Sequence, residues 1–101
     1  MKHKSPDTEK TIQIDKDLTM KQAAQVLQEL VATEKKYEAL HIVTKNECQM
    51  DLAGFQVLVA IANKTRESKK AFQLTLHLAA ESEQLLQRTG LSAVLTQLNN
   101  S

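Results

Sequence analysis

Three short stretches of the chain have the residue pattern of β-strands. Thr11–Ile14 alternates between apolar and polar residues, and Ala39–Thr44 is rich in the β-branched and apolar residues typical of a strand in mid-sheet. Phe72–Leu78 alternates most regularly, so one of its faces is predicted to be buried and the other wet. A sheet with one wet face favours helices packed mainly on the other face.

Between the first two strands, apolar residues recur at three- and four-residue intervals, as they do in a helix that covers a core with one side. Thr19 and Gln22 have the spacing of a capping box, which predicts that this helix begins near Met20. Its predicted apolar stripe consists of Met20, Ala23, Ala24, Leu27, Leu30 and Val31.

A second helix is predicted to follow Asp51, which stands at the N-cap position. Its first part, Leu52–Ala62, is apolar nearly all round and is therefore expected to be mostly buried. A third helix is predicted over Ser82–Thr89, with Gly90 at the left-handed stop position. The residues Val94–Leu98 fit a short terminal helix after that stop.

These elements fit one α/β domain over residues 11–98. Residues 1–10 are almost all polar or charged and are expected to form a flexible N-terminal tail, while residues 99–101 are expected to fray. A chain of 101 residues has no room for a second domain, and one core can bury about two thirds of its unfolded surface.

Composition and charge exclude several classes of protein. The net charge is +1, from 13 basic and 12 acidic residues, and aromatic content is 3%, so nucleic-acid binding is not expected. No apolar run approaches the roughly 20 residues that span a bilayer, so membrane insertion is not expected either. A single cysteine and a charged N-terminus without a signal core predict a cytoplasmic protein.

The residue types that carry most catalysis are scattered along the sequence. His3, His41 and His77 have no second ligand at helical or turn spacing, so no metal site is predicted. Cys48 has no histidine nearby to activate its thiol. The chain has only two glycines and no phosphate-binding loop. We therefore predict no cofactor and no enzyme activity.

What remains is the turn that leads into the second helix, formed by Asp51, Leu52, Ala53, Gly54 and Phe55. By itself, an aspartate N-cap followed by a glycine one turn into a helix needs no binding role. The wider sequence context gives this turn a second interpretation. Together with Met50 and Leu58, it forms one part of a pattern that extends over most of the chain.

In the order of its elements and in this turn, the chain resembles the STAS domain family of anti-sigma-factor antagonists, over roughly Ile12 to Leu95. The resemblance implies an α/β fold with an about four-stranded mixed sheet and helices mainly on one face. It also implies that the turn from Asp51 to Phe55 binds a protein partner. The other matching pieces are Ile12–Ile14 with Leu18, Ala23 with Leu27, and Arg88–Leu91.

In the family, a kinase-like anti-sigma factor phosphorylates the hydroxyl residue after the aspartate, and the added charge separates the partners. Leu52 occupies that position here and Ala53 supplies no hydroxyl, so no phosphorylation is expected at this turn. Lys16 also stands in place of a glycine, Val43–Lys45 lacks the usual aspartate, and the first family strand is missing. The chain is thus similar to a divergent member that keeps its docking surface and has lost the switch.

The resemblance allows several partners: a kinase-like anti-sigma factor, a chemotaxis or other sensory component, or the ATPase of a lipid transporter. The leading hypothesis is a regulatory protein–protein interaction module. The alternative is a structural or scaffold subunit, either a homo-oligomer such as a homodimer or an accessory component of one of these complexes.

Overall fold

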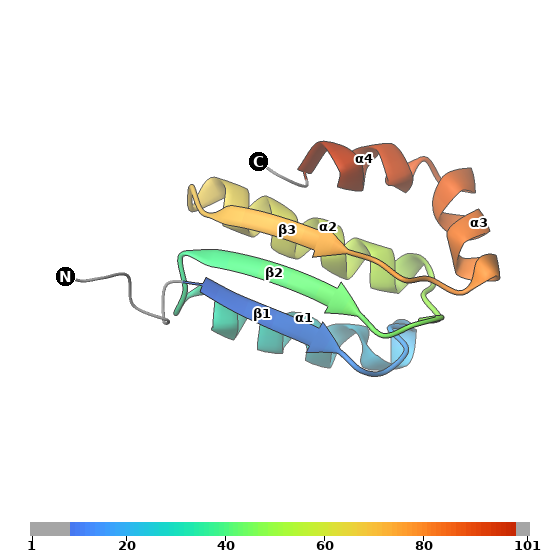
Figure 1. Cartoon of the computed structure of the whole chain (residues 1–101), viewed down its shortest axis with the longest axis horizontal. Coiled ribbons are helices and arrows are strands. Elements are labelled where there is room, and N and C mark those ends of the chain that lie inside the picture. Colours follow the sequence, from blue (N-terminus) through green and yellow to red (C-terminus); the bar gives the residue numbers. More distant parts are fainter. Residues whose placement is uncertain (1–8, 99–101) are drawn as a thin grey trace.

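The computed structural model describes residues 9–98, which form an α/β fold in which strands and helices alternate (Figure 1). The predicted types of element are confirmed in their predicted order. The elements are β1 (Glu9–Ile14), α1 (Met20–Glu34), β2 (Ala39–Thr44), α2 (Leu52–Glu67), β3 (Ala71–Thr75), α3 (Ala80–Arg88) and α4 (Leu91–Leu98).

The sheet has three strands in the order β1-β2-β3, and all of them are parallel. A helix follows each of the first two strands and returns the chain to the end of the sheet at which that strand began. The next strand therefore runs in the same direction. Ile12, Ile42 and Leu74 lie side by side in this register. The expected mixed sheet of about four strands is therefore not found within residues 9–98.

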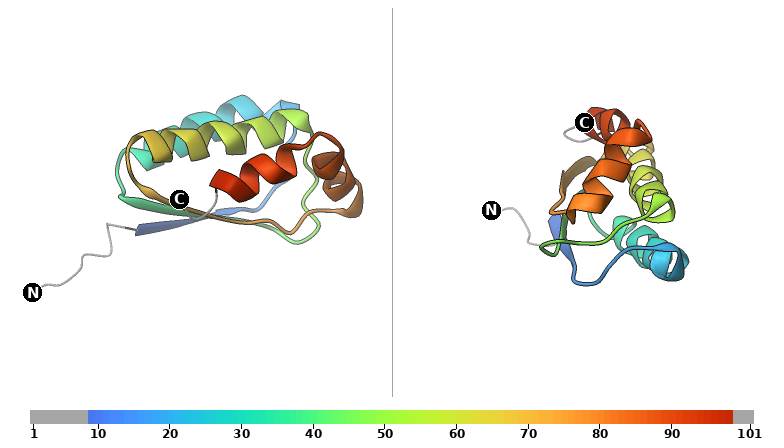
Figure 2. Two further views of the ribbon diagram at one scale, coloured as in Figure 1. Left: turned by 90° about the horizontal axis from the view of Figure 1, so that it is seen from above. Right: turned by 90° about the vertical axis from the view of Figure 1, so that its right-hand side faces the viewer.

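Helices α1 and α2 lie side by side on the same face of the sheet (Figure 2). Ile42 and Phe72 point from the sheet toward this layer and are 0% and 3% exposed. Phe55 and Ile61 of α2 meet them in one core cluster. The other face carries mostly polar residues, and the ring of His41 there lies 2.9 Å from the Thr75 hydroxyl.

The ends of several elements differ from the prediction. β1 begins at Glu9, so the end of the predicted tail belongs to the sheet, while residues 1–8 and 99–101 lie outside the described part of the chain. β3 stops at Thr75, although Leu78 still forms an isolated bridge with Cys48. Gly90 has a φ of 78°, which confirms the left-handed stop.

The last helix starts directly after Gly90, at Leu91, earlier than the Val94 that was expected. It packs against α2 and runs alongside β3 (Figures 1 and 2). Leu74 and Leu76 on the β3 side and Leu95 on α4 line a small hollow between them. Helix α4 thus lies beside the β3 edge of the sheet.

A buried ion pair joins the C-terminal end of α1 to the residue that precedes β3. Glu34, the last residue of α1, is 1% exposed, and its Oε2 lies 3.3 Å from the Nζ of Lys70, just before β3. The Lys70 ammonium also donates to the backbone carbonyl of Glu34. Since a buried carboxylate is costly without a cation, this contact fixes where α1 ends.

Candidate docking site at the start of the second helix

The side chain of Asp51 connects the starts of both long helices. Its Oδ1 accepts a hydrogen bond from the backbone N–H of Gly54 at 3.0 Å, which confirms the predicted N-cap of α2. Its Oδ2 accepts a second bond, at 2.9 Å, from the backbone N–H of Met20, the first residue of α1. One carboxylate therefore caps two helices, and both of its oxygens are used inside the protein.

Gly54 is required by a close approach of two backbone segments. A Cβ at this position would lie 2.1 Å from the carbonyl oxygen of Leu18 and 2.7 Å from the Cγ of Met50. Leu18 and Met50 themselves form a parallel bridge, with the Leu18 N–H donating to the Gln49 carbonyl at 2.9 Å. The glycine thus lets α2 begin directly against the bridge between the two loops.

The five residues of the predicted site have different surroundings. Phe55 is 0% exposed and belongs to the core, Gly54 is buried, and Asp51 is half-buried under its two bonds. Only Leu52, which is 46% exposed, and the half-buried Ala53 can present side chains to a partner. The predicted docking turn is therefore mostly a structural joint with an apolar tip.

Met20, the first residue of α1, adds a second exposed apolar side chain to that of Leu52 and is 75% exposed. The prediction that Met20 and Ala24 lie on the buried stripe of α1 is wrong, because both are exposed. The other members of the predicted stripe are confirmed: Leu30 is buried, and three more pack against the core while partly buried, namely Ala23, Leu27 and Val31. Val26 and Glu34 are also buried, at four-residue spacing from Leu30, and were not predicted. Apolar residues on α1 form a band wider than the sheet contact needs, and periodicity alone does not show which edge of that band reaches solvent.

Between α1 and α2 lies a shallow hollow of about 240 Å³. We call the exposed apolar residues at the helix starts, Met20 and Leu52, together with this hollow, the α1–α2 surface. Small side chains form much of the hollow, so the two helices approach without filling the space above their contact. The lining residues are Ala23, Ala24, Leu27, Ala53, Gln56 and Val57.

The polar groups near the turn have structural partners. The carboxylate of Asp17 accepts a bond from the Gln49 N–H at 3.0 Å and lies 3.2 Å from the Lys45 ammonium, and these contacts lower its pKa. Cys48 is fully buried, and burial raises the pKa of its thiol. A buried thiol with a raised pKa is a poor nucleophile.

Within residues 9–98, no three His, Cys, Asp or Glu side chains come together as metal ligands would. His41 is bonded to Thr75 across the sheet, and His77 is exposed. His3 lies outside the described residues. In the same part of the chain, no helix has both the length and the apolar character to cross a bilayer.

In comparisons of sequence and of structure, no known protein family, no curated protein and no solved structure matches this chain.

Proposed function

We propose that the protein is a non-enzymatic docking module, similar to the STAS-domain anti-sigma-factor antagonists, that binds a cytoplasmic signalling protein through the α1–α2 surface. The observation that carries this proposal is the exposure of Met20 and Leu52 beside an apolar hollow. Exposed apolar patches with a hollow are typical of protein-binding surfaces. The resemblance at Asp51 and Gly54 adds the class of partner: a kinase-like anti-sigma factor, a sensory component or a transporter ATPase.

Docking at this surface is constitutive in our proposal. Leu52 stands at the tip of the turn, where the resembling family has its phosphate acceptor, and a leucine cannot be phosphorylated. Its 46% exposure leaves apolar area that a partner can bury. Thr44, a hydroxyl residue at the end of β2, is 1% exposed and accepts a bond from the His77 N–H, so a kinase cannot reach it in the folded protein. Ser68, at the end of α2, is exposed.

The test is affinity capture of cytoplasmic partners by the wild-type protein and by Leu52→Glu, followed by measured affinities for the partner recovered. A buried charge in place of a central apolar residue should weaken binding by about tenfold or more. Asn63→Glu is the matched control, because Asn63 is an exposed residue further along α2 and takes the same charge. Its affinity should stay within about twofold of wild type.

Circular dichroism of all three proteins must show the same helix content. Equal affinity of wild type and Leu52→Glu for the partner would refute the docking site. Incorporation of phosphate at residues 51–54 by a captured kinase would refute constitutive docking, whereas labelling of Ser68 would show that a switch acts from the other end of α2.

A further inference from the structure

The outer edge of β1 directs backbone groups away from the sheet, toward a side where the described residues place no strand. The carbonyl of Ile14 accepts a hydrogen bond from the Lys45 N–H at 2.9 Å, so Ile14 directs its backbone groups toward β2. Alternate residues of a parallel strand bond to the same neighbour, which places Lys10 and Ile12 in the same ladder. The N–H and C=O groups of Thr11 and Gln13 therefore point away from the sheet, and within residues 9–98 no strand pairs with that side.

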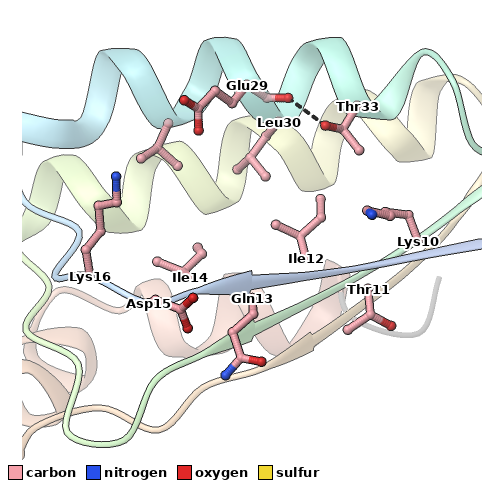
Figure 3. A pocket seen from close by; sticks show the side chains of 11 residues that line it. Lys10, Thr11, Ile12, Gln13, Ile14, Asp15, Lys16, Glu29, Leu30 and Thr33 are labelled. Carbon is pink, nitrogen blue, oxygen red and sulfur yellow. Dashed lines mark hydrogen bonds between the residues drawn. The ribbon is translucent and has the colours of Figure 1, made fainter.

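An apolar groove follows this edge on the helix side of the sheet, with a volume of about 370 Å³. Ile12 and Ile14 form its floor, and Leu30 of α1 lies above them (Figure 3). Ile12 is only half-buried, although it belongs to the face that packs against the helices. Glu29 of α1 stands beside Leu30 at the upper rim of the groove (Figure 3). An added strand would supply the side chains that this groove lacks.

The two edges of the sheet are unequal, and this limits how copies can join. Helix α4 lies beside β3 and stands in the way of a strand added at that edge, whereas β1 has no such neighbour among the described residues. Two β1 edges, by contrast, can pair with each other about a two-fold axis, and that contact closes at a dimer. An axis perpendicular to the sheet makes the strands antiparallel and keeps all helices on one side.

We propose that two copies of the protein pair through β1, antiparallel, with Ile12 of one copy opposite Ile12 of the second. Thr11 then lies opposite Gln13 of the second copy, so the outward backbone groups of both residues form a ladder. The two Ile12 side chains meet on the helix side and cover the apolar grooves. The two three-stranded sheets become one continuous sheet.

Side-chain pairing favours this register over the two neighbouring ones. Lys10 of the second copy lies opposite Ile14, on the helix side that also carries Glu29. A shift by two residues in one direction places two positive charges opposite each other, Lys10 and Lys16 of the second copy. The opposite shift places Ile12 against Lys10 and so loses the apolar contact between the two Ile12 side chains. The proposed register contains one unfavourable pair, because Glu9 lies opposite Asp15 of the second copy, and both carboxylates are exposed.

The first test compares the mass of wild type and Thr11→Pro by analytical ultracentrifugation, up to about 1 mM because so small an interface is weak. Proline is tolerated on an edge strand where its missing N–H faced outward, so the fold should persist. We expect wild type to dimerise and Thr11→Pro to remain monomeric with unchanged circular dichroism. Wild type that stays monomeric, or a folded Thr11→Pro that still dimerises, would overturn the proposal.

A gain of affinity provides a second test that misfolding cannot imitate. Asp15→Lys converts the Glu9–Asp15 repulsion into an attraction at two symmetric places and should tighten the dimer about fivefold. Glu47→Lys, an exposed site outside β1 with the same change of charge, should leave the dimer constant within about twofold. No tightening by Asp15→Lys would exclude this register.

Chemical cross-linking locates the contact. Cys48 is buried, so a cysteine introduced on the surface is the one expected to react with a short bismaleimide. Gln13→Cys should cross-link into dimers, whereas Gln73→Cys, on the same face but on β3, should not, because two further strands per copy separate it from the contact. Cross-linking of Gln73→Cys alone would place the dimer contact elsewhere. None of these changes alters Met20 or Leu52, so the partner-docking proposal stands or fails separately.

Discussion

Asp51 was predicted to bind a partner, and in the structure it has a structural role of which the sequence predicts only one part, the N-cap of α2. Its N-cap bond to Gly54 spans three residues and follows from the local pattern Asp-x-x-Gly. Its bond to Met20 joins residues 31 positions apart, which no local pattern predicts. In the proposed docking site, Asp51 would therefore act indirectly, by positioning Leu52 at the surface.

We expect Asp51→Ala to lower the free energy of unfolding by about 2 kcal/mol, because two helix caps are lost at about 1 kcal/mol each. Asp51→Asn retains one acceptor oxygen and should lose about half as much. Urea unfolding followed by circular dichroism measures both values. Equal stabilities of Asp51→Ala and Asp51→Asn would contradict the double cap, because the acceptor oxygen that asparagine retains would then contribute nothing.

The single-residue predictions failed where one residue type serves two environments. Met20 and Ala24 are apolar and fit the helical period, yet both lie on the side of α1 that faces solvent. Gly54 was recognised as part of a motif, but its close contact with the Leu18 carbonyl depends on a loop bridge that the chain makes only after folding. Such contacts depend on which elements become neighbours, and local spacing does not contain that information.

Helix α4 is the element whose role was least visible in the sequence. Its length is 8 residues, too short to be stable alone, and its pattern gave only a weak terminal helix. In the structure it packs against α2 and lies beside β3, with Leu95 4% exposed. Tertiary burial, not helix propensity, therefore holds it in place.

The burial of one side of α4 predicts that truncating its neighbouring residues Val94 and Leu95 lowers the free energy of unfolding by different amounts. Leu95→Ala should destabilise the protein by about 3 kcal/mol, as expected for a buried leucine. Val94→Ala should cost less than about 0.5 kcal/mol, because Val94 is 37% exposed. Thermal and urea unfolding give both values, and similar costs at the two positions would mean that α4 is not packed against the core through Leu95.

The strand predictions were better for the type of element than for its ends. Phe72–Leu78 alternates along its whole length, but β3 stops at Thr75. Beyond that point the chain leaves the β2 ladder, and the Cys48 N–H bonds to the His77 carbonyl instead. Leu76 and Leu78 continue to pack against the core, so the alternation persists where the strand does not.

For the molecule as a whole, the alternation of strands and helices was enough to predict an α/β domain with helices against one side of a sheet. The number of strands was expected from family resemblance, and residues 9–98 contain three where about four were expected. The parallel direction of the described strands follows from the helical crossovers between them.

The pH dependence of stability should reflect Asp17, which ties the loop after β1 to the loop after β2. The bond from Gln49 and the charge of Lys45 lower its pKa from 3.8, so the folded state favours the ionised carboxylate. The resulting stabilisation is present above the unfolded pKa and is lost as the pH falls through the folded value. Asp17→Asn should therefore be less stable than wild type at pH 7.

Urea midpoints measured from about pH 7 to about pH 2.5 test this prediction, and the difference between wild type and Asp17→Asn should narrow below the ordinary carboxylate range. Glu38→Gln, which removes an exposed carboxylate, serves as the control and should follow the wild-type curve. A difference between wild type and Asp17→Asn that stays constant across the acid range would show that the loss comes from packing and not from ionisation.

The carboxylate shared by α1 and α2 also has a kinetic consequence. When the first turn of either helix opens, Asp51 must move, and the amide it held on the other helix loses its acceptor at the same time. Fraying at these two helix ends is therefore one cooperative event, and the amide protons of Met20 and Gly54 should exchange with solvent through a common opening. The two hydrogen bonds of the Asp51 carboxylate thus hold together the helix starts that carry the exposed side chains of Met20 and Leu52.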